Sequence, residues 1–342
     1  MNILIVKLSA IGDVIHTLPS LAGLRKLYPN AHITWVIEEA SSDLIMDHPH
    51  IDRVMISQRK QWLKDLKHGR FSKPLNEIKF FIEELRSRPY DLVIDFHGLF
   101  KSAVLVFLSD GRRKLGYDSM QELSGLTLTE KIPEDMGKHA VDRYLDFIRY
   151  LGGDIEEPEF LIPIQEENIR RVDELLQRNG IDNKDRFVAV SPVALWDTKL
   201  WRDERFAELC DLIVEKLNTK VIFTGRDPNR LTNIQSLMKS HSVNLGGETT
   251  LRDLAYLYKL SSLLITTDSG PMHLAAAVGI PVVALFGPTD AARTGPYWKG
   301  HTIIRRKLPC SPCFLKKCDS MECMSGLTVE EVYQAIKIKL NG

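Results

Sequence analysis

Short apolar runs recur along this chain at intervals that leave room for a helix between one run and the next. They occupy residues 3–8, 33–37, 91–96, 187–190, 221–224, 263–267 and 281–286. This spacing is typical of alternating strands and helices, which build parallel sheets, and not of hairpins. Many of the runs are apolar almost throughout, as expected when helices cover both faces of a sheet. We therefore predict an α/β protein with doubly wound parallel sheets.

The length of the chain, 342 residues, favours two domains of ordinary size over one. Residues 1–165 form the first predicted domain, and a second series of strands begins at residue 187. Residues 166–186 contain a charged amphipathic helix and a polar turn, which we interpret as a linker. The second domain extends over residues 187–325, and residues 326–342 are predicted to form a C-terminal helix.

The overall charge excludes some classes of partner. Lys plus Arg and Asp plus Glu both number 45, so the chain lacks the basic excess of most nucleic-acid-binding proteins, and we expect no nucleic-acid partner. No apolar run approaches the roughly 18 residues that indicate a transmembrane helix. The first residues form a predicted strand without the basic region or cleavage site of a signal peptide, so we expect a cytoplasmic protein.

A polar turn at residues 267–273 lies between the predicted strand 263–267 and a helix of small residues. Its sequence is Thr267-Asp268-Ser269-Gly270-Pro271-Met272-His273. A turn from a strand into a helix directs backbone N–H groups and the positive end of the helix dipole at one point, which suits a phosphate or diphosphate. Ligands of open parallel sheets bind at this carboxyl edge. His273 either donates to such a phosphate or only satisfies the turn.

The loop after the first strand, residues 7–16, contains Gly12 and Asp13 and opens a helix. Asp13 either caps that helix or acts as a general base, and the spacing alone does not separate these roles. The loop has no Gly-x-Gly-x-x-Gly pattern, so it does not indicate a dinucleotide site.

Two further polar residues follow strands of the second domain. Lys199, flanked by Trp196 and Trp201, is either a surface lysine or a point charge that holds a phosphate. Asp227 either accepts from a ribose hydroxyl or caps the turn that its Asp-Pro-Asn sequence favours.

Residues 59–73 form a basic, amphipathic segment. Its cations are Arg59, Lys60, Lys64, Lys67, Arg70 and Lys73, against the single acid Asp65. Such a segment can lie on an anionic membrane surface, bind an anionic acceptor, or be a solvated loop. Lys101 and Arg113 add positive charge to the same half of the chain.

Four of the five cysteines lie close together near the end of the chain, at Cys310, Cys313, Cys318 and Cys323. One Cys-x2-Cys pair is present, but the second pair has a different spacing. A structural metal site, reduced cysteines and disulfides are the three alternatives, and a cytoplasmic location disfavours the disulfides.

Several motifs together resemble the ADP-heptose:lipopolysaccharide heptosyltransferases. They are residues 7–19, residues 95–102, Lys199-Leu200-Trp201 and residues 267–273, in the order that the family has them. The resemblance implies the glycosyltransferase B (GT-B) fold, in which two Rossmann-like domains face a central cleft. It implies inverting transfer of L-glycero-D-manno-heptose from ADP-heptose to the inner core of lipopolysaccharide, by an enzyme peripheral to the cytoplasmic face of the inner membrane.

The resemblance also assigns roles to residues. Asp13 matches the general base and Lys199 the diphosphate-binding lysine, while Asp227 takes the ribose-binding position, where the family more often has Glu. The remaining nucleotide-sugar-binding positions are Thr267, Asp268, Ser269, Gly270 and His273. The acceptor-binding positions are Ser9, Gly12, Arg59, Lys60, Lys101 and Arg113.

The identity of the acceptor is left open by two conflicting similarities. Residues 95–102 and 113–117 look closest to the first heptosyltransferase, which implies a Kdo-lipid A acceptor. The cysteine-rich tail is more similar to the second and third enzymes, which implies heptosyl-Kdo-lipid A. The chain has no Asp-x-Asp motif, so no cofactor is expected in catalysis, and zinc or iron at the cysteines would be structural. The alternatives are another nucleotide-sugar transferase or epimerase of this fold, and a non-catalytic nucleotide-binding protein at the membrane.

Overall fold

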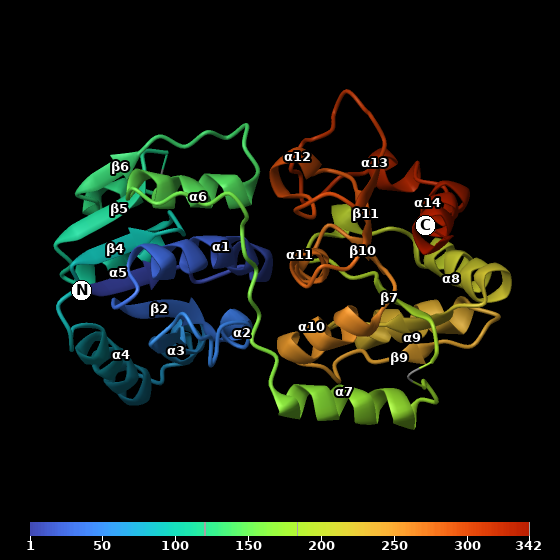
Figure 1. The fold of residues 1–342 in the computed structure, drawn as a ribbon, viewed down its shortest axis with the longest axis horizontal. Helices are drawn as coiled ribbons and strands as arrows, with labels where there is room; N and C mark the ends of the chain where they lie inside the picture. The colour runs from blue at the N-terminus through green and yellow to red at the C-terminus, as the bar shows by residue number, and fades with distance from the viewer. Residues whose placement is uncertain (120, 183, 342) are drawn as a thin grey trace. The chain divides into compact units, whose positions relative to one another are not determined.

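The computed structural model describes residues 1–119, 121–182 and 184–341. It contains two compact units, Met1–Pro163 and Ile164–Gly342. Each unit is built on a parallel sheet of six strands with helices around it (Figure 1). The predicted α/β class with doubly wound parallel sheets is therefore confirmed.

In the first unit, the chain builds the sheet outwards from its centre in two directions. Its strands are β1 (Asn2–Val6), β2 (His32–Glu38), β3 (Arg53–Ser57), β4 (Leu92–Asp95), β5 (Arg113–Tyr117) and β6 (Glu130–Ile132). Their order is β3-β2-β1-β4-β5-β6, and all neighbours are parallel. The direction of winding reverses between β1 and β4, so the loops after these two strands diverge at the carboxyl edge, where open parallel sheets bind their ligands.

Helices cover this first sheet. They are α1 (Ile11–Leu27), α2 (Glu39–Ser42), α3 (Arg59–Lys67), α4 (Ser72–Leu85), α5 (Phe100–Leu108) and α6 (Ala140–Tyr150), with a 3-10 turn at Ser124–Thr127. Helices α1 and α6 pack side by side, as do α3 and α4 (Figure 1). Because helices cover β1 and β4, their apolar side chains are buried, as the unbroken apolar runs predict.

The second unit repeats the same winding. Its strands are β7 (Phe187–Ser191), β8 (Lys220–Phe223), β9 (Val243–Asn244), β10 (Leu264–Thr267), β11 (Val282–Phe286) and β12 (Thr302–Arg305). Their order is β12-β11-β10-β7-β8-β9, and the reversal falls between β7 and β10. The predicted strands at 187–190, 221–224, 263–267 and 281–286 thus form the four central strands of this sheet.

The helices of the second unit include two that bear on the predicted boundaries. The described helices of the second unit are α7 (Glu166–Arg178), α8 (Asp203–Leu217), α9 (Pro228–Leu237), α10 (Leu251–Leu260), α11 (Gly270–Ala277), α12 (Ala291–Thr294), α13 (Glu322–Ser325) and α14 (Val329–Asn341), with a 3-10 turn at Asp197–Lys199. Helix α7, which the sequence assigned to a linker, packs against α10 within this unit. Asn168 Nδ2 donates to Asp253 Oδ1 at 2.8 Å, which joins the two helices through a buried polar contact. Residues 183 and 342 of the predicted linker and C-terminal helix lie outside the described residues.

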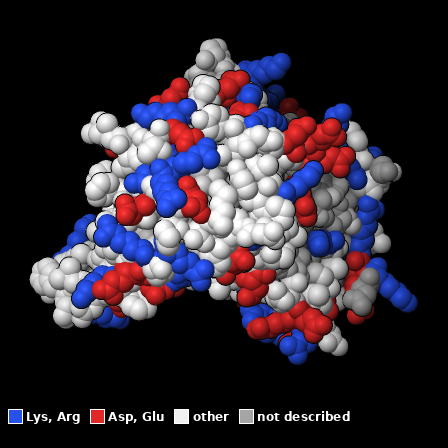
Figure 2. Space-filling model, turned by 60° about the vertical axis from the view of Figure 1, so that its left-hand side comes forward, with Lys and Arg blue, Asp and Glu red and all other residues white. Residues whose placement is uncertain are grey.

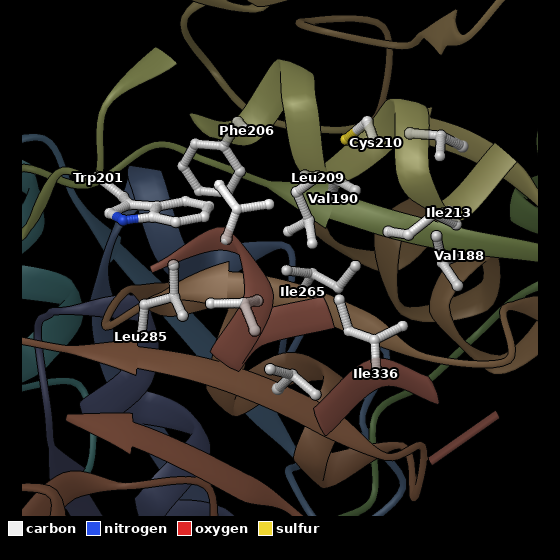
Figure 3. Close-up of a cluster of buried hydrophobic side chains, with 14 of the residues drawn as sticks. Val188, Val190, Trp201, Phe206, Leu209, Cys210, Ile213, Ile265, Leu285 and Ile336 are labelled. Atoms are coloured by element: carbon white, nitrogen blue, oxygen red, sulfur yellow. The ribbon is translucent and has the colours of Figure 1, made fainter. Parts of the chain in front are cut away.

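A buried apolar cluster holds α8 and α14 against the second sheet (Figure 3). Trp201 and Phe206 meet edge to face, with their ring centroids 5.0 Å apart. The indole N–H of Trp201 donates to Leu327 O at 3.1 Å, so the buried ring leaves no unpaired donor. Ile336 from α14 completes the cluster, and α14 is therefore part of the second unit's core and not an appendage.

The surface carries charges of both signs. Over the face shown in Figure 2, Lys and Arg side chains are interspersed with Asp and Glu. Within the described residues, no helix combines the length and the apolar character that crossing a membrane requires.

Candidate functional site

In the second unit, Lys199 and Asp268 form a buried ion pair at the reversal of the sheet. Lys199 Nζ lies 2.6 Å from Asp268 Oδ2, and the two side chains are only 16% and 6% exposed. Thr289, which follows β11, donates its hydroxyl to the same oxygen at 2.6 Å. The ammonium also lies 4.5 Å from the centroid of the Trp196 ring. Lys199 is therefore not a solvated surface lysine, because loops after β7, β10 and β11 all contribute to its surroundings.

The turn after β10 supplies donors next to this pair. Ser269 is the extended residue before α11, and Gly270 and Pro271 begin the helix. Proline has no N–H, so the free backbone donors of this helix start come from its neighbours. Thr267 Oγ1 donates to Val193 O at 3.3 Å and ties this turn to the loop after β7. The helix N-terminus and the N–H groups of Lys199 that do not face Asp268 together give this edge of the sheet hydrogen-bond donors suited to an anion.

The other two predicted nucleotide-binding residues lie on either side of this pair. His273 is buried in the first turn of α11. Asp227 follows β8, one strand outward from β7, and is exposed. Its Oδ1 accepts from Arg230 N at 3.1 Å, so Asp227 caps α9 as the turn interpretation predicted.

In the first unit, Asp13 lies in the first turn of α1, after β1. Its Oδ2 accepts from Ala10 N at 3.1 Å, so the carboxylate caps the helix. Lys7 lies buried nearby and donates to Phe96 O at 2.9 Å and to the Tyr144 hydroxyl at 2.6 Å. Burial lowers the pKa of Lys7 below its ordinary value, and the carboxylates of Asp13 and Asp95 oppose this shift. A half-buried carboxylate beside a buried ammonium is thus present at the carboxyl edge of this sheet.

Glu38, which sequence analysis missed, gathers most of the predicted acceptor-binding cations. Its carboxylate lies 3.1 Å from Arg59 Nη2, 3.0 Å from Lys60 Nζ and 3.4 Å from Lys101 Nζ. Lys101 Nζ also donates to Ser9 Oγ at 3.0 Å. The available signal was an acid directly after the apolar run 33–37, at the carboxyl end of β2. Such a residue lies at the same edge as the loops after β1 and β4, because parallel strands all end there.

Arg113 is not brought to this cluster, contrary to its predicted role in acceptor binding. It is the first residue of β5, so it lies at the amino edge of the parallel sheet. Its guanidinium binds Glu130 through two hydrogen bonds, of 2.7 and 2.9 Å. A residue that begins a parallel strand lies at the opposite edge from the loops after β1 and β4, and this geometry corrects the assignment.

The structure does not support the predicted metal site at the four cysteines. Their thiols are free, with Cys310 and Cys318 exposed and Cys313 and Cys323 partly buried. Across the part of the chain that the structure describes, no three His, Cys, Asp or Glu side chains are grouped so as to hold a metal ion.

Two doubly wound units, each with its polar side chains at the reversal of its sheet, form the GT-B fold. The family model for glycosyltransferase family 9 (heptosyltransferase) matches residues 78–324. The chain therefore belongs to glycosyltransferase family 9. The family resemblance of its motifs is confirmed.

Individual relatives agree with this assignment over nearly the whole chain. The lipopolysaccharide heptosyltransferase 1 of Pseudomonas aeruginosa is 27% identical over 328 residues, which cover 93% of this chain and 87% of that protein. The crystal structure of a family 9 glycosyl transferase from Veillonella parvula superposes with a TM-score of 0.86 at 26% identity, covering 99% and 97% of the two chains. The E. coli heptosyltransferase WaaC with ADP gives a TM-score of 0.80 at 26% identity, covering 99% and 100%.

The charge cluster around Glu38 predicts a pH-dependent stability. Burial alone would raise the pKa of Glu38, but hydrogen bonds from Lys60 and Arg59 and the charge of Lys101 hold it below the ordinary value of 4.5. Its stabilising effect is therefore complete above about pH 4.5 and is lost as the pH falls through the lowered value. We expect Glu38→Gln to unfold at lower urea concentration than wild type at pH 7, and the difference to shrink below pH 4.5.

Tryptophan fluorescence during urea unfolding at several pH values measures this difference. Glu83→Gln is the matched control, because Glu83 is an exposed carboxylate whose partner is Lys79 at 3.8 Å on the same helix. An equal difference at pH 7 and at pH 3.5 would show that Glu38 is not stabilised by these cations.

Proposed function

We propose that this protein transfers L-glycero-D-manno-heptose from ADP-heptose to the inner core of lipopolysaccharide, with inversion at the anomeric carbon. The observation that carries the proposal is the buried Lys199–Asp268 pair beside the N-terminus of α11 in a chain of family 9. Support comes from relatives named lipopolysaccharide heptosyltransferase and from WaaC, which was solved with ADP and with ADP-2-deoxy-2-fluoro heptose.

The second unit would hold the donor. Lys199 has three N–H donors and uses one toward Asp268, so the others can meet a diphosphate. When the bond between the anomeric carbon and the β-phosphate oxygen breaks, ADP gains negative charge. Lys199 and the backbone N–H groups at the start of α11 would stabilise that charge as it develops. Asp227 is proposed to accept from a ribose hydroxyl.

The first unit would hold the acceptor and take its proton. As the acceptor oxygen forms its bond to the anomeric carbon, its hydroxyl proton would pass to the Asp13 carboxylate. Ser9, Arg59, Lys60 and Lys101 would bind the carboxylate or phosphate groups of a Kdo-containing lipid A acceptor. Gly12, with no side chain, would let the sugar approach the start of α1.

The proposal is tested by donor and acceptor selectivity. Purified protein is incubated with ADP-heptose or with UDP-sugars, and with Kdo-lipid A or heptosyl-Kdo-lipid A, and the products are weighed by mass spectrometry. We expect a gain of one heptose from ADP-heptose with one of the two acceptors. Transfer from UDP-sugars alone, or release of ADP with neither acceptor, would contradict the proposed function.

Substitutions of Asp13 in the first unit and of Lys199 in the second are expected to have different kinetic effects. Asp13→Asn keeps the size of the side chain but removes the base, so we expect at least about a 100-fold loss of kcat with unchanged ADP affinity. Lys199→Ala removes a charge that acts on the donor in both the ground state and the transition state. It should therefore raise the KM for ADP-heptose and lower kcat together.

Calorimetric titration with ADP, alongside steady-state kinetics, separates these effects. Lys216→Ala, a cation of α8 without a proposed role, serves as the control for Lys199→Ala. Wild-type turnover in Asp13→Asn would remove Asp13 from the reaction, and unchanged donor kinetics in Lys199→Ala would remove Lys199 from the donor site.

We also propose that the exposed face of α3 rests on the cytoplasmic surface of the inner membrane. Lys60, Leu63, Lys64 and Lys67 share one face of this helix at spacings of three and four residues. Its opposite face is anchored by Trp62, whose indole N–H donates to Glu77 Oε2 at 2.9 Å. On the neighbouring α4, Leu75 is 54% exposed, and Phe71, the residue before this helix, is 59% exposed. Lysines around exposed apolar groups are typical of helices that lie on anionic bilayers.

Sedimentation with lipid vesicles tests this surface. We expect binding to vesicles that contain phosphatidylglycerol, little binding to pure phosphatidylcholine, and release by salt, because the lysine contribution is screened. Leu63→Ser with Phe71→Ser should reduce binding several-fold, whereas Ile338→Ser, a 71% exposed residue of α14, should not. Equal binding of both variants, or of both vesicle types, would exclude this surface.

A further inference from the structure

The imidazole of His97 lies in the loop after β4, next to the reversal of the first sheet. Asp95 shapes this loop: its Oδ1 accepts from the backbone N–H groups of His97 at 2.8 Å and Gly98 at 3.1 Å. Its Oδ2 accepts from Ser102 Oγ at 2.9 Å, which ties the loop to the start of α5. Gly98 has a φ of +69°, which a side chain would disfavour. Three hydrogen bonds to one buried carboxylate therefore determine where the imidazole lies.

Both ring nitrogens of His97 are buried, and neither has a hydrogen-bond partner among the described residues. No other described imidazole has both nitrogens in this state. Most buried polar atoms of folded proteins are paired, because an unpaired one has lost its hydrogen bonds to water without replacement. An imidazole that a well-bonded loop holds in such a position indicates a hydrogen-bond partner that does not belong to the chain.

The charges around His97 come from the proposed acceptor site. The pKa of His97 is lowered to about 3, first by burial and then by the ammonium groups of Lys7 and Lys101, while Asp13 and Glu38 act in the opposite direction. The ring is therefore neutral at physiological pH, with one nitrogen as donor and the other as acceptor. So weak a base is unsuited to take the proton of a sugar hydroxyl, and that role stays with Asp13.

We propose that His97 binds the acceptor sugar by hydrogen bonds between its neutral imidazole and a hydroxyl group next to the one that reacts. A hydroxyl both donates and accepts, so it matches either ring nitrogen, whereas a carboxylate or phosphate matches only the N–H. The cations around Glu38 would bind the acidic groups of the acceptor, and His97 would select the orientation of its sugar ring. This inference rests on the proposed function, because it assigns a residue to that same acceptor site.

The experiment compares His97→Leu and His97→Gln with wild type in steady-state transfer of heptose. Leucine fills the space without polar atoms, and glutamine retains a donor and an acceptor. We expect His97→Leu to raise the KM for the acceptor roughly ten-fold or more and to leave the KM for ADP-heptose unchanged. His97→Gln should recover part of the lost acceptor affinity.

Thermal unfolding of the free protein separates recognition from a structural role. Replacing an unpaired buried polar group with an apolar one of similar size is neutral or stabilising, so His97→Leu should unfold at the wild-type temperature or above it. His32→Leu is the matched control. His32 begins β2 at the amino edge of the same sheet, so this substitution should change neither KM.

The outcomes distinguish this inference from the function on which it rests. Wild-type transfer with an unchanged acceptor KM in His97→Leu would overturn the role of His97 and leave the proposed function intact. A lower unfolding temperature in His97→Leu with equal losses for donor and acceptor would also overturn it, in favour of a structural role. A wild-type protein that transfers no heptose to either acceptor would overturn both proposals.

Discussion

The structure depends on one constraint, which is that every strand of each sheet runs in the same direction. Parallel pairing places all strand ends at one edge, so the loops that follow them share that edge whatever their separation in sequence. The winding reverses between β1 and β4 and between β7 and β10. At these two places the neighbouring loops run in opposite directions away from each other. Polar side chains from several loops can therefore meet there, because no connection between strands passes over them.

Each group of candidate residues is centred on a buried charge that is already paired. An isolated buried charge is costly, so Lys199 lies against Asp268 and Glu38 is surrounded by three cations. Each group also retains hydrogen-bonding capacity beyond its internal pairs. Pairing keeps these charges in place in the free protein, and the unused donors suit them to anionic substrates. His97 differs, because its nitrogens have no partner among the described residues.

How far the site could be predicted varied with the kind of signal. Residues 267–273 were singled out because a strand, a turn and a helix follow one another directly in the sequence, so the pattern can be recognised from consecutive residues. Arg113 was wrongly grouped with the acceptor cations, since charge alone does not show which end of a strand a residue occupies. Glu38 and His97 were missed because their significance depends on partners from other strands, or on the lack of them. The pairing of Asp268 with Thr289 crosses 21 residues and had no local signature.

The sequence by itself determined the alternation of buried strands with helices, and hence the α/β class and the two series of strands. It could do so because unbroken apolar runs and helical periodicity are local consequences of burial. Only the tertiary structure decided strand order, which edge each charged residue occupies, and that α7 packs with the second unit. These properties depend on contacts between residues far apart in the chain, and neither the composition nor the spacing of residues along the sequence shows which distant residues meet.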